Sequence, residues 1–468
     1  MTEPARSAAE AAELLGSQSV SSTELTGSYL DRIERLNPIL HAVIAIAPDA
    51  LDAARASDQR RRNGDLLGPL DGIPVLIKDN IEAAGLPGTA GSRALLSAPP
   101  AADAPLVAQL RGAGMVVLGA TNLSEWANFR SLTSTSGWSA VGGQTRNPHD
   151  TGRNTSGSSS GSAAAVAAGL VPVSVGTETD GSIVSPAGVC GVVGFKPTRG
   201  SIPAAGIVPI SPRQDTAGPM ARTVTDAVAL YRILAGVTAP LPAVELAGRR
   251  VASWRQPTAP PEVAACHAEL ERLLAAAGAI VVPTAAEEPS GPFEDAELQA
   301  LVAEFSVALP AYLATRPGEH PRTWAELLAF NQADEVELSK FSDEIFGLCA
   351  EAIEAGGTTN PKYLQARQAC DAAAAQSLTG VLADCAFTIT PTNSPAWPIR
   401  YGEDEHNQVL TSSLCAITGS PSISLPAGSV GGLPLGISLL GRRGADLELL
   451  GYAAAVERLL PPPAFPTL

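Results

Sequence analysis

The first sixty residues show the spacing of apolar side chains that predicts helices. Leu25, Leu30 and Leu36 fall on one face of such a helix. Thr23, with Glu24 directly after it, is the expected N-cap.

Short apolar runs at 73–77, 115–118 and 171–176 predict buried strands, because a strand covered on both faces is apolar at successive positions. Residues 160–169 (SGSAAAVAAG) predict a helix of small side chains that packs closely against a sheet. This alternation of strands and helices is typical of an α/β fold.

The second half of the chain changes character twice. A further strand–helix–strand passage is expected between 240 and 285, and residues 286–385 then become mostly helical and charged. Strands are expected again at 385–392 and 422–426, before a final helix and a proline-rich tail. We expect residues 286–385, the helical insertion, to lie over a cleft of the α/β domain.

Composition and charge indicate which side chains build the core and which classes of partner the protein can bind. Of 468 residues 45% are hydrophobic but only 4% aromatic, so the core must consist mainly of small aliphatic side chains. Acidic residues exceed basic ones by 47 − 31 = 16. This argues against a nucleic acid or an anionic membrane as the main partner, because both bind clustered Lys and Arg. The longest basic run, Arg60–Arg62, is expected in a solvated loop, and a small-molecule or short-peptide substrate is the expected partner.

The sequence has no signal-type apolar segment near its start and no run of eighteen apolar residues, so we expect a cytoplasmic protein without a membrane span. Its cysteines show neither a CxxC pair nor zinc-ligand spacing, and we expect them to be free thiols. They are Cys190, Cys266, Cys349, Cys370, Cys385 and Cys415.

Three local features could carry chemistry, and the first is Lys78. It ends the apolar run IPVLI, where an ammonium is costly to bury unless it is paired or neutral. Two interpretations fit this position: a side chain at the end of a strand that reaches solvent, or a buried amine.

The second feature is TSGSSSGSAAAVAAG (155–169), which fits either a flexible linker or a loop that presents backbone amides at a helix N-terminus. The third is GTETDGSIVSPAG (176–188), where Ser182 follows Gly181 between a strand and a turn. A serine in this setting is either an ordinary turn residue or a nucleophile with neighbouring amides as an oxyanion hole.

A serine activated by histidine is the competing arrangement. The five histidines, at positions 41, 149, 267, 320 and 406, lie in no glycine-rich or catalytic-looking setting, and there is no GxSxG motif. If Ser182 is a nucleophile, we expect a group other than histidine to activate it.

Taken together and in order, the three features resemble the amidase signature family. Ser158 stands 80 residues after Lys78, and Ser182 stands 24 residues after Ser158. The resemblance is concentrated between Gly72 and Asp226, and segments such as LDRIERLNPILHAV and GSPSISLPAG extend it over nearly the whole chain.

This resemblance implies one α/β domain spanning residues 1–468, with a twisted mixed sheet covered by helices on both faces. Residues 72–226 would form its signature core, and the helical insertion (286–385) would partly cover the cleft. A monomer and a homodimer are both compatible with the sequence.

The resemblance also implies a Ser-cisSer-Lys triad. Ser182 would be the nucleophile, Lys78 the general base, and Ser158, in a cis peptide bond after Gly157, the bridge between them. To accept a proton, Lys78 needs a pKa lowered from about 10.4 to about 7–8, roughly 3–5 kcal/mol of differential stabilisation. The apolar run before Lys78 would supply the desolvation.

The same resemblance implies that the backbone N–H groups of Thr179, Asp180, Gly181 and Ser182 form the oxyanion hole. Asp215 would lie close to the active site, where it either orients the nucleophile loop or simply caps a turn. Neither a metal nor an organic cofactor is implied, because lysine acts as the base and the backbone stabilises the oxyanion.

Three departures from the usual family motif resemble the peptide amidase branch. Val184 replaces an Arg, Asp180 replaces a Gly, and Glu178 stands where Asp is usual. This branch implies hydrolysis of C-terminal peptide amides or similar small amides with release of ammonia, and the missing Arg argues against a free-carboxylate substrate. The alternatives are an aryl or aliphatic acylamidase, the amidase component of a tRNA-dependent amidotransferase, and an inactive binding protein on the same scaffold.

Overall fold

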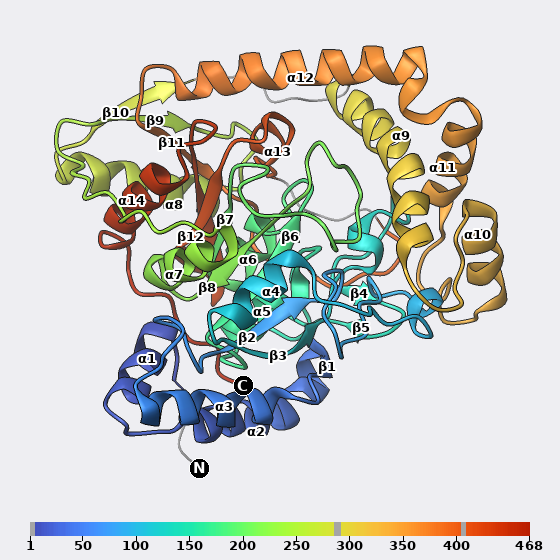
Figure 1. Cartoon of the computed structure of the whole chain (residues 1–468). Coiled ribbons are helices and arrows are strands. Elements are labelled where there is room, and N and C mark those ends of the chain that lie inside the picture. Colours follow the sequence, from blue (N-terminus) through green and yellow to red (C-terminus); the bar gives the residue numbers. More distant parts are fainter. Residues whose placement is uncertain (1–4, 285–291, 404–408) are drawn as a thin grey trace.

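The centre of the molecule is a mixed sheet of eleven strands (Figure 1), seen in a computed structural model that describes residues 5–284, 292–403 and 409–468. Neighbouring strands follow the order β1-β3-β2-β6-β8-β7-β12-β13-β11-β9-β10. The neighbours β3, β2 and β6 are parallel, as are β11, β9 and β10, and the other neighbouring pairs are antiparallel.

The strands of this sheet, and a separate short hairpin of β4 and β5, have the following bounds: β1 Val43–Ile46, β2 Pro74–Lys78, β3 Val116–Thr121, β4 Trp138–Ser139, β5 Gly143–Gln144, β6 Val173–Glu178, β7 Val193–Lys196, β8 Thr216–Ala221, β9 Arg250–Trp254, β10 Ile280–Thr284, β11 Phe387–Pro391, β12 Ser422–Val430 and β13 Leu433–Leu440.

The α-helices are α1 Ala8–Gly16, α2 Ser22–Leu40, α3 Ala50–Asn63, α4 Pro105–Gly112, α5 Ser160–Ala167, α6 Val184–Cys190, α7 Val224–Ala235, α8 Pro261–Ala276, α9 Pro292–Thr315, α10 Trp324–Ala333, α11 Glu344–Glu354, α12 Pro361–Leu382, α13 Ser413–Thr418 and α14 Asp446–Glu457. Three short 3₁₀ segments are η1 Arg93–Leu95, η2 Glu125–Asn128 and η3 Gly357–Thr359.

Helices cover both faces of the sheet, which confirms the expected α/β architecture. Helices α5 and α6 contact each other on one face, and α7, in contact with α4 and α14, packs on the other. The small side chains of α5 allow this close approach: all eight residues of the helix are buried. A Cβ at Gly161 would lie only 2.3 Å from the Ala42 carbonyl oxygen and 2.5 Å from that of Asn122.

The strands expected at 73–77, 115–118 and 171–176 are confirmed as β2, β3 and β6, each beginning one or two residues later and ending one to three residues later than expected. All positions of these three strands are buried, as their continuous apolar runs predicted. All six cysteines are free thiols, and five of them are buried.

Two local expectations were wrong. The N-cap of α2 is Ser21, which forms a capping box with Glu24, while Thr23 lies inside the first turn and binds Asp58. The run Arg60–Arg62 ends helix α3 rather than occupying a loop. Arg60 is paired there with the buried Asp71 at 2.7 Å.

The helical insertion follows β10, and its described part, residues 292–385, contains α9, α10, α11, η3 and α12; residues 286–291 lie outside the described residues. Figure 1 shows α12 along one edge and α9, α10 and α11 grouped at one end of the molecule. Phe305, Trp324 and Phe346 form the aromatic centre of a second core, which also includes Trp126 of the signature core.

Within the described residues, one helical segment, Asp295–Thr315 of α9, is long and apolar enough to cross a membrane by length and composition. This segment packs inside the protein against α11, α12 and η3. Leu309 and Leu313 are completely buried in the second core, which accounts for its hydrophobic composition.

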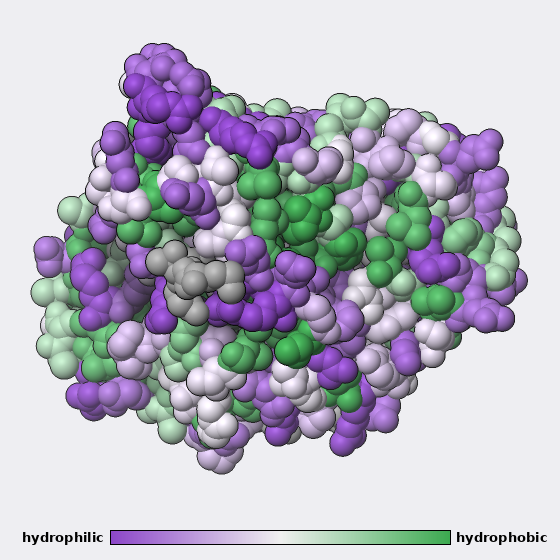
Figure 2. All heavy atoms as spheres, turned by 90° about the horizontal axis from the view of Figure 1, so that it is seen from below, coloured by the Kyte–Doolittle hydropathy of each residue, from purple (hydrophilic) through white to green (hydrophobic). Residues whose placement is uncertain are grey.

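The surface around the N-terminal helices carries no single continuous apolar area. Figure 2, which views the molecule from that side, shows hydrophobic patches interrupted by hydrophilic side chains. The more exposed large apolar residues of this part of the chain, Ile39, Ile46, Leu66 and Leu67, are between 39% and 52% exposed.

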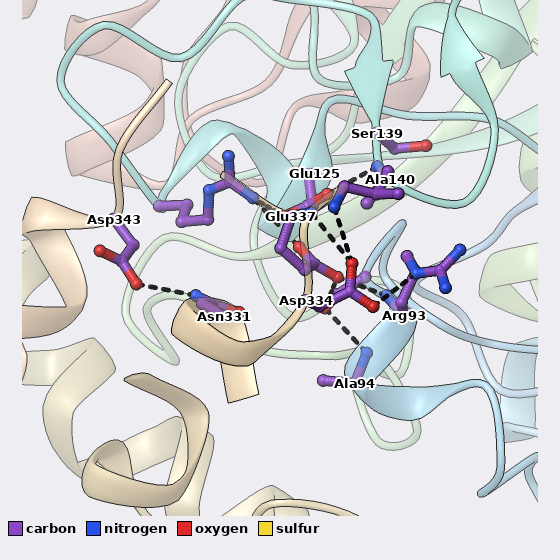
Figure 3. A network of polar contacts seen from close by, with 12 residues as sticks. Arg93, Ala94, Glu125, Ser139, Ala140, Asn331, Asp334, Glu337 and Asp343 are labelled. Atoms are coloured by element: carbon purple, nitrogen blue, oxygen red, sulfur yellow. Dashed lines mark hydrogen bonds and ion pairs between the residues drawn. The ribbon is translucent and has the colours of Figure 1, made fainter. Parts of the chain in front are cut away.

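A buried charge cluster ties the helical insertion to the signature core. Arg130 pairs with Glu125 and, at 3.1 Å, with Glu337, and all three side chains are completely buried. Glu125 accepts the Ala140 N–H, and Glu337 accepts the Arg93 N–H at 2.7 Å (Figure 3). Burial, followed by the charge of Glu337, raises the pKa of Glu125 well above its ordinary value.

Replacing Arg130 by Met should therefore lower the free energy of unfolding by about 3–5 kcal/mol, because two carboxyls would share a buried site without a cation. Urea unfolding at pH 7 measures this loss. Arg55→Met is the matched control: its pair with Asp52 is exposed, with side chains 62% and 78% accessible, and should contribute about 0–1 kcal/mol. Equal losses of unfolding free energy in Arg130→Met and Arg55→Met would contradict the conclusion that the buried charge cluster holds the helical insertion on the signature core.

Candidate active site

Lys78 is the last residue of β2 and is completely buried between β3 and β6. The interpretation of Lys78 as a side chain reaching solvent is therefore wrong. Burial lowers the pKa of Lys78 to about 7, against the opposing effect of the negative charges of Glu178 and Asp215. At neutral pH a large fraction of this lysine is an uncharged amine.

The amine of Lys78 has three neighbours. Its Nζ lies 2.7 Å from Ser158 Oγ, 2.9 Å from Thr177 Oγ1 and 3.3 Å from the Thr177 carbonyl oxygen. Asn80 Nδ2 also donates to Thr177 Oγ1, at 3.0 Å. Thr177 thus fixes the direction of the lysine amine relative to Ser158.

Ser158 is completely buried and follows a cis peptide bond from Gly157, as expected. Its carbonyl oxygen accepts the N–H of Ser124 at 3.1 Å. The loop approaches Ser124 so closely that a Cβ at Gly157 would lie 2.2 Å from Ser124 Oγ, which is itself held by the Gly137 N–H. A side chain at position 157 would therefore have to displace the Ser124 hydroxyl.

Ser182 lies on the turn between β6 and α6 and is 8% exposed, so it is the most accessible member of the expected triad. Its carbonyl oxygen accepts the N–H of Ser159 at 3.1 Å, which joins this turn to the Ser158 loop. Among the described residues, no hydrogen bond joins the side chains of Ser182 and Ser158. The structure thus brings Lys78 and Ser158 into direct contact and places Ser182 on the adjoining turn.

The turn before Ser182 requires an unusual backbone. Gly181 has φ +75°, and a Cβ at this position would lie 2.9 Å from Ser412 Oγ. The buried Glu178 carboxylate accepts the N–H groups of Ile183 and Val184 at 2.7 and 3.0 Å. In the described part of the chain, the N–H groups of Gly181 and Ser182 have no such acceptor.

Two backbone N–H groups at the start of helix α5 already have acceptors. The N–H of Ser159 donates to the Ser182 carbonyl oxygen, and the N–H of Gly161 donates to the Asn122 carbonyl oxygen. The segment 155–169 is therefore not a flexible linker. It is a packed loop and helix that hold Ser158.

Asp215 combines the two roles expected for it. Its carboxylate accepts the hydroxyl of Thr179 at 2.6 Å, and it caps a turn by accepting the N–H groups of Ile210 and Ser211 at 2.9 and 3.0 Å. Burial raises the pKa of Asp215 to about 6. Asp215 therefore anchors the turn that carries Ser182, through Thr179, the residue before Asp180.

The sequence did not reveal the partners of Asp180. This carboxylate accepts the hydroxyls of Ser412 and Ser413, at the start of α13, and hydrogen-bonds with Glu297 of α9. The available signal was the pair Glu297 and Glu304, seven residues apart and the two acidic residues of the mostly apolar stretch 296–315. Acidic residues at this spacing share one helix face and need buried partners.

No histidine among the described residues hydrogen-bonds with Ser182. His267 Nε2 lies 2.9 Å from Ser253 Oγ, but both residues are buried on α8 and β9, and His267 Nδ1 has no partner. His406 lies outside the described residues. Within residues 5–284, 292–403 and 409–468, no group of three His, Cys, Asp or Glu residues could hold a metal ion.

Comparison with known proteins shows the family of the chain. The family model described as Amidase matches residues 24–450. A probable amidase of Arabidopsis thaliana is 39% identical over 95% of this chain and 89% of its own length.

One solved structure and a second relative extend the comparison. The native peptide amidase of Stenotrophomonas maltophilia superimposes with a TM-score of 0.89 at 41% identity, covering 98% of this chain and 99% of that one. A glutamyl-tRNA(Gln) amidotransferase component of Salinispora arenicola is 33% identical over 99% of both chains.

The close approach at Gly157 generates a stability prediction. Gly157→Ala should lower the free energy of unfolding by about 1–3 kcal/mol, because the added methyl overlaps Ser124 Oγ. Gly27→Ala in α2 is the control: its Cβ meets nothing within 4 Å, and the change should stabilise the helix by about 0.5–1 kcal/mol. Chemical unfolding of both variants provides the comparison, and an unaffected Gly157→Ala would show that the loop has room to move.

Proposed function

The chain is an amide-hydrolysing enzyme of the amidase signature family, and from this premise we propose that Ser182, Ser158 and Lys78 are its catalytic triad. The observation that carries the proposal is the buried Lys78 amine, whose pKa is lowered to about 7 by burial, 2.7 Å from Ser158 Oγ. A general base works best when its pKa lies near the operating pH.

The contacts of Lys78 fit an uncharged amine, which has two N–H donors and one lone pair. The two N–H groups can donate to Thr177 Oγ1 and to the Thr177 carbonyl oxygen. The lone pair is then left to accept the Ser158 hydroxyl proton across the 2.7 Å contact between Nζ and Ser158 Oγ. In this arrangement Lys78 is ready to accept a proton through Ser158.

The reaction would proceed through an acyl-enzyme. Ser182 Oγ attacks the amide carbonyl carbon while its proton passes to Ser158, whose own proton passes to Lys78. The tetrahedral intermediate collapses as the same protons return through Ser158 to the leaving nitrogen, and the C–N bond breaks. Water then attacks the acyl group by the reverse relay and releases a carboxylic acid and Ser182.

The oxyanion of the intermediate would be stabilised by backbone N–H groups of the turn from Thr179 to Ser182. Gly181 and Ser182 are the strongest candidates, because the next two amides along the chain already donate to Glu178. Loss of one such donor in a serine hydrolase costs about 2.7–4 kcal/mol of transition-state stabilisation.

C-terminal peptide amides, or similar small amides that release ammonia, are the substrates we propose. The similarity to a peptide amidase over nearly the whole chain supports this choice. Position 184 carries a buried valine, so it offers no cation for a free carboxylate on the substrate, and Asp180 adds a negative charge nearby.

A second candidate is the ammonia-producing component of a tRNA-dependent amidotransferase, favoured by the Salinispora relative, which matches this chain over its full length. This relative is 33% identical to the chain, whereas the peptide amidase is 41% identical, so we rank the amidotransferase function second. An aryl or aliphatic acylamidase would use the same triad on a different acyl or amine group.

We expect the protein to release ammonia from a C-terminally amidated peptide and to leave its internal peptide bonds intact. Ser182→Ala should abolish this turnover, because no acyl-enzyme can form. Coupled ammonia detection and mass spectrometry of the peptide, with its free-acid twin as blank, measure the reaction.

The matched control is Ser97→Ala, at an exposed serine whose hydroxyl donates to the Glu319 carbonyl oxygen. It should retain wild-type turnover. Activity of Ser182→Ala within tenfold of wild type would remove the triad assignment. Hydrolysis of a simple aliphatic amide or an anilide alone would keep the triad and change the substrate class.

The pH profile tests Lys78 as the base. Its protonated form cannot accept a proton, so kcat/KM should rise roughly tenfold per pH unit below pH 7 and stop rising near pH 7, where burial places the pKa of Lys78. Initial rates between pH 5 and pH 7.5 measure this rise.

Lys78→Arg, which stays protonated, should be inactive across that range, whereas Lys362→Ala, at an exposed lysine of α12, should keep the wild-type profile. A wild-type rate independent of pH between 5 and 7 would be incompatible with Lys78 as the base.

A further inference from the structure

A pair of acidic side chains joins the nucleophile turn to the helical insertion. Glu297, on α9, is 8% exposed, and its side chain hydrogen-bonds with that of Asp180, two residues before Ser182. Two carboxylates cannot hydrogen-bond with each other, because neither has a proton to donate. One member of the pair must be a carboxylic acid.

The neighbours favour Glu297 as the member that holds the proton. The hydroxyls of Ser412 and Ser413 donate to the two oxygens of Asp180, as suits a carboxylate. Glu297 Oε1 accepts from Gln214 Nε2, at 2.9 Å. A carboxylic acid at 297 satisfies both contacts, because its carbonyl oxygen accepts from Gln214 while its O–H donates to Asp180.

Further contacts, made through Gln214, attach the turn before Ser182 to the helical insertion. Gln214 Nε2 also lies 3.3 Å from the Thr179 carbonyl oxygen, and Arg367 of α12 donates to Gln214 Oε1 at 2.6 Å. Thr179 and Asp180, the two residues before Gly181, are thus attached to α9 and α12 of the insertion.

We propose that Glu297 is a positioning residue for amide hydrolysis: as a carboxylic acid it donates to Asp180 and holds the turn that carries Gly181 and Ser182. This inference rests on the proposed function of Ser182 as nucleophile. Loss of the proton would place two negative charges side by side and push the turn away from α9.

The surroundings favour the protonated state of Glu297. Burial, and then the charge of Asp180, raises the pKa of Glu297 to about 8, against the effects of Gln214 and Arg367. The charged and titratable groups that act on the pair come from β6, β7, α12 and α13, and they are Glu178, Lys196, Arg367, Cys370 and Cys415.

The expected consequence is an alkaline decline in activity. In the wild type, kcat/KM on the amidated peptide should fall roughly tenfold per pH unit above pH 8, as Glu297 loses its proton. Glu297→Gln keeps a donor for Asp180 and an acceptor for Gln214 but does not titrate. This variant should retain near wild-type kcat at pH 7.5 and show no decline up to pH 10.

Two further variants separate positioning from a general effect of the helix. Glu297→Leu removes both hydrogen bonds and should lower kcat roughly tenfold to a hundredfold at every pH, with KM changed far less. Asp295→Asn removes an exposed carboxylate from the same helix and should behave as wild type. An alkaline decline that persists unchanged in Glu297→Gln, or a wild type without one, would overturn the proposal.

Thermal unfolding tests the carboxyl pair without any turnover. The pKa of Glu297 is raised in the folded chain from an ordinary 4.5 to about 8. Its proton therefore stabilises the fold fully below pH 4.5, and this stabilisation is lost as the pH rises to about 8. The Tm of wild type minus that of Glu297→Gln should fall across this range and level off above it.

The two readouts keep the proposals distinct. If no amide is hydrolysed but the Tm difference follows this course, the carboxyl pair stands and the proposed function fails. A Tm difference independent of pH would reject the protonated pair, whatever the activity.

Discussion

The cost of removing the Lys78 amine from water governs the arrangement of the candidate site. A charged ammonium in this position would need a close counter-ion, yet the nearest atoms are the hydroxyls of Ser158 and Thr177 and one carbonyl oxygen. These neighbours satisfy a neutral amine and leave an ammonium without a paired anion. The strands on both sides of β2, together with α5, exclude water, and the close packing of α5 depends on its small side chains. The reactivity proposed for Ser182 therefore depends on the exclusion of water from the end of β2 that carries Lys78. This exclusion depends in turn on the alanine and glycine residues of α5, which allow the helix to pack closely.

Three buried acidic side chains near the turn of Ser182 each accept hydrogen bonds from neighbouring groups. Glu178 and Asp215 are buried, and burial raises the pKa of each, but backbone N–H groups donate to both carboxylates. Asp180 has serine hydroxyls and Glu297 in place of amides. Each acid thus fixes one segment next to Ser182: the start of α6, the 210–215 turn, or the contact with α9. Hydrogen bonds to ionised groups are directional and about twice as strong as neutral ones, so they position a turn better than apolar packing does.

Much of the fold was predictable because it depends on local patterns. The apolar runs of β2, β3 and β6 reflect burial on both faces, and the resemblance in motif order located Lys78, Ser158 and Ser182.

Strand β8 was not predicted from the sequence, because it contains Gly218 and Pro219, two residue types that are disfavoured inside strands. Both are tolerated in this central strand. A Cβ at Gly218 would lie 2.1 Å from the Phe195 carbonyl oxygen, and Pro219 is paired with β6 beyond the last residue that pairs with β7. The contact of Glu297 with Asp180 spans over a hundred residues, so no local pattern could reveal it.

The helical insertion is attached to the signature core by polar contacts as much as by apolar ones, and this affects how the two parts work together. Glu337 pairs with Arg130 at one end of the insertion, and Glu297 hydrogen-bonds with Asp180 near Ser182. Glu304, also on α9, accepts the hydroxyls of Ser211 and Tyr363 between these points. Apolar surfaces can slide past each other at little cost, but a buried carboxyl that loses its partner is left unsatisfied, at a cost of several kcal/mol. The insertion is therefore held in one register against the turn of Ser182. Changes in its outer helices need not move the turn of Ser182, provided that these three acids keep their partners.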